Sequence, residues 1–77
     1  MDKSTFYLKL DEMLELDPGS TQGSTRLADM EAWDSLAVMS FIAMADSDYG
    51  ISLAAKAIAA CRTVDDLVAL IEEKQHG

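Results

Sequence analysis

The sequence predicts an all-α fold: a small four-helix bundle of three main helices and one short helix, with a long loop between helices 1 and 2. Three observations lead to this prediction. Apolar residues recur at helical spacing in three segments, and no segment alternates between apolar and polar residues as a half-buried strand does. A run of turn-forming residues, 18–25, separates the first two helical segments. The 77 residues are enough for one small domain, which we expect to cover residues 1–77.

The first helix is expected over about residues 3–16. Ser4 or Asp2 can cap its start, and Pro18-Gly19 is expected to end it. On a helical wheel the apolar and charged residues separate into two faces, which is typical of a surface helix packed against a core. The apolar face holds Phe6, Tyr7, Leu10, Met13 and Leu14, and the charged face holds Lys9, Asp11, Glu12 and Glu15.

Residues 17–33 should form a long connection. Its first half is rich in Gly, Ser and Thr and has a single Pro, a composition typical of turns. Loops of this length are uncommon in compact domains and are often functional. We expect Leu27, Met30 and Trp33 to anchor the loop by placing their side chains in the core.

The second helix should begin near Asp34 or Ser35, both of which are favourable first residues, and end at Gly50. It has two apolar stripes, whereas a surface helix needs only one. The second stripe is therefore either buried as well or kept for partner proteins. The core-facing stripe comprises Val38, Phe41, Ile42, Ala45 and Tyr49, and the second stripe, close to Ser35, comprises Leu36, Met39 and Ala43.

Two more helices complete the prediction. A short alanine-rich helix is expected over residues 52–60, and the last helix over residues 64–74. Thr63 and Asp66 have the spacing of a capping box at the start of the last helix. The inward residues are Leu53 and Ile58 in the short helix, and Val64, Leu67, Val68 and Ile71 in the last one.

The composition argues against several classes of partner. Six basic residues against fourteen acidic ones give a net charge of −8, which disfavours both nucleic acid and an anionic membrane surface. A protein partner with a basic surface fits this charge better. Cys61, the only cysteine, excludes an internal disulfide and is expected to be a small buried side chain. Because neither a signal peptide nor a membrane span is visible, we expect a monomeric cytoplasmic protein without membrane insertion.

The sequence lacks the sets of residues that a catalytic site or a calcium site requires. A nucleophilic serine requires a positioned base, but the one histidine, His76, lies in the C-terminal tail. Asp46 and Asp48 have the spacing that opens a calcium loop. However, Ile51 stands where that loop needs glycine, and Ala57 stands where it needs glutamate. We therefore expect no catalytic residue and no metal site.

Ser35 allows two interpretations. It can cap the second helix, as serine often does, or its hydroxyl can carry a phosphate-linked group. A helix start is exposed and its dipole favours a nearby anion, so a phosphodiester is electrostatically favourable there. Both interpretations hold together if Asp34 caps the helix and Ser35 is left to react.

The motif Asp34-Ser35-Leu36, with the apolar helix that follows it, resembles the acyl carrier protein family. The similarity covers nearly the whole chain: a short acidic protein, a long loop before the motif, and a helical C-terminal half. It implies that Ser35 bears a covalent 4′-phosphopantetheine arm, donated from coenzyme A by a phosphopantetheinyl transferase, with Asp34 and Leu36 as the flanking residues. Acyl groups would be held on this arm as thioesters. By the same resemblance, acyl-activating and acyl-transferring enzymes with basic docking surfaces are expected to contact Leu36, Met39, Ala43 and Asp46.

The sequence departs from the carriers of fatty acid synthesis at several positions. Ala37, Ser40 and Ser47 occupy positions of the second helix that are often charged in those carriers. The short helix carries Lys56 and no acid, and Trp33 replaces the small residue that is common before the motif. We therefore predict a specialised stand-alone carrier for a lipid, polyketide or surface-glycan pathway. The alternatives are a peptidyl or aminoacyl carrier protein, or an acidic helical interaction module without the arm.

Overall fold

The computed structural model describes residues 2–76, and these residues form four α-helices, one 3₁₀ turn and no strand. This confirms the predicted all-α bundle of three main helices and one short helix. The long connection between the first two helices is also present, and the 3₁₀ turn lies within it. The elements are α1 (Lys3–Met13), η1 (Leu27–Asp29), α2 (Ser35–Tyr49), α3 (Ala55–Ala59) and α4 (Val64–His76).

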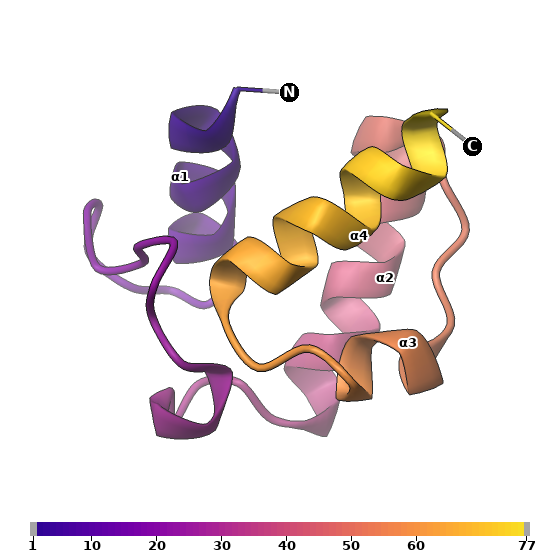
Figure 1. The fold of residues 1–77 in the computed structure, drawn as a ribbon. Helices are drawn as coiled ribbons and strands as arrows, with labels where there is room; N and C mark the ends of the chain where they lie inside the picture. The colour runs from indigo at the N-terminus through magenta and orange to yellow at the C-terminus, as the bar shows by residue number, and fades with distance from the viewer. Residues whose placement is uncertain (1, 77) are drawn as a thin grey trace.

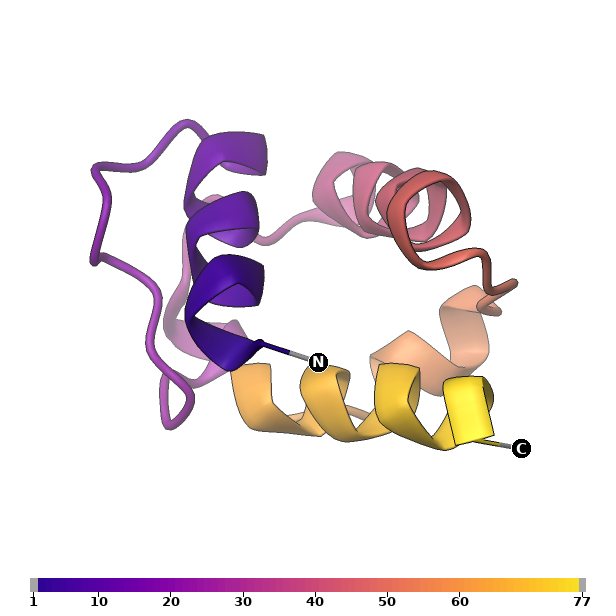
Figure 2. The same ribbon diagram turned by 90° about the horizontal axis from the view of Figure 1, so that it is seen from above.

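Helix α2 lies against each of the other three helices. In Figure 1, α4 crosses in front of α2 on the right of the molecule, and α1 lies on the left. Figure 2 shows α1, α2 and α4 on three sides of the interior. The start of α2, the η1 turn and the short helix α3 all lie at the lower end of the molecule in Figure 1.

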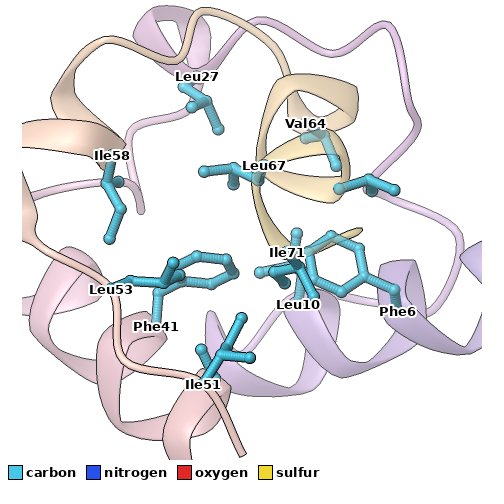
Figure 3. Packing of buried hydrophobic residues seen from close by; sticks show 12 residues of the cluster. Phe6, Leu10, Leu27, Phe41, Ile51, Leu53, Ile58, Val64, Leu67 and Ile71 are labelled. Carbon is cyan, nitrogen blue, oxygen red and sulfur yellow. The ribbon is translucent and has the colours of Figure 1, made fainter. Parts of the chain in front are cut away.

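One hydrophobic core joins the four helices, and its side chains converge in Figure 3. The ring of Phe41 meets Phe6 and Trp33 edge to face, with centroids 6.1 Å and 5.8 Å apart. Burying one such large apolar side chain stabilises the fold by about 1.5–3 kcal/mol. The predicted loop anchors pack on this core, with Leu27 buried and Met30 and Trp33 partly buried. The core comprises Phe6, Leu10, Leu27, Phe41, Ala45, Ile51, Leu53, Ile58, Val64, Leu67, Val68 and Ile71.

Helix α1 ends earlier than predicted, at Met13 rather than near residue 16. Glu15 adopts a left-handed backbone conformation with φ of 59°. The amide of Leu16 donates to the carbonyl of Asp11 at 2.8 Å, and the amide of Glu15 donates to the carbonyl of Glu12 at 3.2 Å. These two bonds form a Schellman motif, which closes the helix before the Pro-Gly pair is reached.

Asp11 does not lie on the exposed charged face where the wheel placed it. Its side chain is only 2% exposed. The two carboxyl oxygens accept hydrogen bonds from the backbone amides of Gly19 at 2.9 Å and Thr21 at 2.8 Å. Because buried polar groups need partners, these bonds hold the first part of the long loop against the end of α1.

The second part of the long loop is joined to the start of α4. The amide of Leu27 donates to the carbonyl of Arg62 at 2.9 Å, and the amide of Val64 donates to the carbonyl of Thr25 at 3.0 Å. Between these bonds, Arg26 and Thr63 form an isolated antiparallel bridge. The loop is therefore fixed at both ends.

The last two helices differ from the prediction in their bounds. Helix α3 begins at Ala55 rather than near residue 52, because the preceding residues are extended and Leu53 reaches the core from that extended segment. Helix α4 continues to His76. The predicted capping box is confirmed: the hydroxyl of Thr63 accepts from the amide of Asp66 at 3.3 Å, and the carboxyl of Asp66 accepts from the amide of Thr63 at 3.1 Å.

Candidate functional site

The start of α2 is shaped by Asp34. This residue has an extended backbone (φ −118°, ψ −171°) and is the N-cap of the helix. Its Oδ1 accepts a hydrogen bond from the amide of Ala37 at 2.9 Å, and its carbonyl accepts the first helical bond from Val38 at 3.0 Å. Asp34 thus supplies the side-chain cap that the helix needs.

Ser35 is the first residue of α2 and is exposed. Its hydroxyl makes no hydrogen bond to any other group in residues 2–76, so it is not used for capping. The amides of Ser35 and Leu36 also lack a partner within that range, whereas the next two amides, those of Ala37 and Val38, donate to Asp34. These free N–H groups form the positive end of the helix dipole.

This geometry fits a phosphodiester on the Ser35 oxygen. An anion attached there would lie beside two free backbone N–H groups and at the favourable end of a 15-residue helix. The attachment would displace no hydrogen bond of the fold, because Asp34 already caps the helix.

An exposed apolar stripe runs along α2 from this point. The side chains of Leu36 and Met39 are 73% and 68% exposed, and Ala43 is exposed as well. Asp46, which follows Ala43 at helical spacing, is also exposed. The opposite face of α2 buries Ala37, Phe41 and Ala45 in the core. The second stripe is therefore open to solvent rather than buried.

A hollow of about 350 Å³ lies beside Ser35, between the end of α1 and the start of α2. On the α1 side it is lined by the last residue of the helix and the two that follow it, the second of which, Glu15, adopts the left-handed conformation. The α1 side of this hollow could not be predicted from the sequence, because it depends on the Schellman turn at the end of α1. Its lining comprises Met13, Leu14, Glu15, Ala32, Asp34, Leu36, Ala37 and Ser40.

The acids of α2 lie on a helix rather than on a metal-binding loop. Asp46 and Asp48 both belong to α2, and Asp48 pairs with the Lys9 ammonium of α1 at 3.2 Å. Across the described part of the chain, no three His, Cys, Asp or Glu side chains gather as a metal site would require. None of the helices in residues 2–76 is both long and apolar enough to cross a bilayer. His76 is the last residue of α4, and its side chain lies outside the described part of the structure.

The comparison with protein families agrees with this geometry. A family model described as the phosphopantetheine attachment site matches residues 9–71, which is most of the chain. The chain therefore belongs to the phosphopantetheine-binding carrier proteins, the family that includes the acyl carrier proteins. The prosthetic group of this family is 4′-phosphopantetheine. Searches of curated proteins and of solved structures gave no match.

Proposed function

We propose that this protein carries acyl groups as thioesters on a 4′-phosphopantetheine arm attached to Ser35. One observation carries the proposal. The Ser35 hydroxyl is exposed and unbonded among the described residues, at the positive end of a helix that its neighbour Asp34 already caps. Ser35 is the attachment residue in this proposal, and Asp34 and Leu36 are the residues that flank it.

Attachment is a phosphoryl transfer at one oxygen. The Ser35 oxygen attacks the phosphorus that carries the pantetheine group in coenzyme A, and a new O–P bond forms. The bond between that phosphorus and the oxygen of the leaving adenosine 3′,5′-bisphosphate breaks, and a base of the transferase takes the hydroxyl proton. The transferase supplies this base, since Ser35 has no hydrogen-bond partner in residues 2–76. When bound, the group supplies a terminal thiol on which acyl groups are held as thioesters.

The exposed stripe of α2 supports a role in partner recognition. Leu36, Met39, Ala43 and Asp46 lie on the face that any enzyme reaching Ser35 must cover. A flexible methionine suits a surface that meets several partners in turn. The acidic charge of the chain favours enzymes with basic docking surfaces, because complementary fields speed the encounter. The partner enzymes perform the chemistry in this proposal, and the carrier itself is not an enzyme.

The proposed pathway is a specialised one, such as lipid, polyketide or surface-glycan acylation, in the cytoplasm. The support is the composition around the site. Ala37 is buried, and Ser40 is an exposed polar residue without charge beside Leu36. This surface therefore differs from a densely acidic one. In a competition assay, housekeeping fatty-acid enzymes should use this carrier poorly, and efficient use would contradict the specialised role.

The attachment is tested by intact mass. We expect the apo protein to gain one phosphopantetheine group when it is incubated with coenzyme A, Mg²⁺ and a broad-specificity transferase. Ser35→Ala should abolish the gain, whereas Ser47→Ala, which removes an exposed serine near the other end of α2, should leave it intact. An unchanged mass of the wild-type protein would overturn the proposal and favour an interaction module without the arm. Charging of the modified protein by an aminoacyl-activating enzyme would instead identify an aminoacyl carrier.

A further inference from the structure

A second hollow lies where the long loop meets the connection between α3 and α4. Its volume is about 380 Å³, and it is lined by Arg26, Ala28, Cys61, Arg62 and Thr63. Hollows of this size accommodate small molecules or groups. The lining is unusual for this protein, because two of the six basic residues of a chain with a net charge of −8 meet in it.

Neither arginine forms a close ion pair with an acid of the described chain, although the charge of Arg62 is near enough to Asp66 to help lower the pKa of that carboxyl. In residues 2–76 no carboxylate forms an ion pair with Arg26 or Arg62, whereas Lys9 pairs with Asp48 at 3.2 Å. Asp66 follows Arg62 closely in sequence. Its Oδ2 is occupied by two backbone amides, that of Arg62 at 2.9 Å and that of Thr63 at 3.1 Å. Both arginines are exposed, and among the described residues no carboxylate in a close ion pair competes with a ligand for their guanidinium groups.

The hollow is held in shape by main-chain hydrogen bonds and by the Asp66 carboxylate, without any hydrogen bond from an arginine side chain. The amide of Leu27 donates to the carbonyl of Arg62 at 2.9 Å, and Arg26 and Thr63 form the backbone bridge described above. Substitution of either arginine side chain therefore leaves the junction intact. Cys61 adds no negative charge to the lining near neutral pH, because burial and the nearby Asp66 raise the pKa of its thiol above the usual value.

We propose that Arg26 and Arg62 form a binding site for a small oxyanion, the carboxylate or phosphate group of a small molecule. A guanidinium presents paired N–H donors that match both groups, and charge-assisted bonds of this kind are the strong ones. The hollow borders η1, which lies with the start of α2 at the lower end of the molecule (Figure 1). The oxyanion therefore has two sources: the charged end of an acyl group tethered at Ser35, or a free anion. The first source rests on the proposed function, and the second does not.

The site is tested on the apo protein by titration with inorganic phosphate and with succinate at constant ionic strength. We expect saturable changes in the amide chemical shifts of the residues that line the hollow. Because a hydrogen bond to a charged group is worth about 1.5–3 kcal/mol, Arg26→Gln and Arg62→Gln should each weaken binding roughly tenfold or more. Lys56→Gln removes a positive charge from α3 outside the hollow and should leave binding unchanged. Absence of saturable shifts, or shifts that the arginine substitutions do not alter, would overturn the proposal.

The source of the oxyanion is tested on the loaded protein. Carrier loaded with succinyl groups is compared with carrier loaded with butyryl groups, which lack the terminal charge, after mass spectrometry has confirmed loading. Shifts at the hollow that only the succinyl form shows, and that an Arg26→Gln/Arg62→Gln variant loses, would assign the site to a tethered cargo. Equal spectra of the two loaded forms, together with binding of free anions, would assign it to a free anion. Failure to load would overturn the proposed function alone, because the apo titration decides on the site independently.

Discussion

At the residue scale, the carboxyl of Asp11 organises the loop that precedes α2. Its oxygens accept from the amides of Gly19 and Thr21, which lie eight and ten residues further along the chain. Helical periodicity assigns a residue to a face of its own helix, and it carries no information about such distant partners. The N-cap at Asp34 and the exposed stripe of α2 were easier to predict, because each leaves its pattern in the local sequence.

We expect Asp11→Ala to destabilise the protein by about 1–3 kcal/mol, because it leaves buried backbone amides without their acceptor. The change is measured as the loss in free energy of unfolding in urea. Glu12→Ala removes an exposed acid from the neighbouring position and should have an effect within about 0.5 kcal/mol. Equal effects of the two substitutions would show that Asp11 does not hold the loop.

Glu15→Gly should stabilise the protein, by up to roughly 1 kcal/mol, because glycine adopts the left-handed conformation of this residue without strain. The matched control is Glu12→Gly in the last turn of α1, before the left-handed residue, which should cost up to about 1 kcal/mol. Thermal unfolding of the two variants should therefore shift in opposite directions. A loss of stability in Glu15→Gly would contradict the Schellman turn.

At the element scale, periodicity predicted which helices exist but not where each one ends. The inward stripe of α4 and its capping box were predictable, because they depend on residues that are close in sequence. The end of α1 and the start of α3 were not. Leucine favours helices, so the sequence predicted that Leu53 belongs to the short helix. In the structure Leu53 precedes that helix and is buried by tertiary packing, which the local sequence does not show. The hollow beside Ser35 could not be predicted for the same reason, since it depends on the early end of α1.

The start of α4 should be sensitive to acid. The backbone amides of Arg62 and Thr63 donate to Asp66 and hold the pKa of its carboxyl below the usual value of 3.8. The ionised carboxyl therefore contributes stability that is fully present above pH 3.8 and is lost as the pH falls through the lower pKa of the folded state.

Accordingly, Asp66→Asn should destabilise the protein near neutral pH, and its difference from wild type should shrink in acid. The measurement is urea unfolding at about pH 6 and at a series of pH values that decrease from 3.8. Glu73→Gln removes an acid from the other end of α4 and serves as the control for net charge. A difference between wild type and Asp66→Asn that is independent of pH would contradict this role of the carboxyl.

At the scale of the whole molecule, the sequence was sufficient for the helical class, the core and the family, because each depends on a pattern repeated over many residues. The junction between the long loop and the start of α4 was not predictable. It is made by main-chain atoms of Arg26 and Thr63, whose side chains carry no sign of the pairing. The clustering of two arginines in an acidic chain follows from that junction and was missed with it.

The net charge should govern how fast the carrier meets its enzymes. At low salt we expect attachment of phosphopantetheine to be faster, by about tenfold, than at high salt, where the opposing charges are screened. Asp46→Asn should lower the rate at low salt and reduce the salt dependence. Met39→Ala, a change without charge on the same exposed face, should lower the rate at every salt concentration. A transferase reaction that is indifferent to salt would contradict a basic docking surface.

At the start of α2, Asp34 caps the helix and Ser35 remains unbonded within residues 2–76, which affects how partner enzymes can recognise the carrier. Because Asp34 rather than Ser35 caps the first turn, the proposed esterification of the serine would alter no hydrogen bond of the backbone. The unmodified and the loaded carrier should then share one shape. An enzyme that must distinguish an empty carrier from a charged one has to sense the attached group itself, and no rearranged helix can report it.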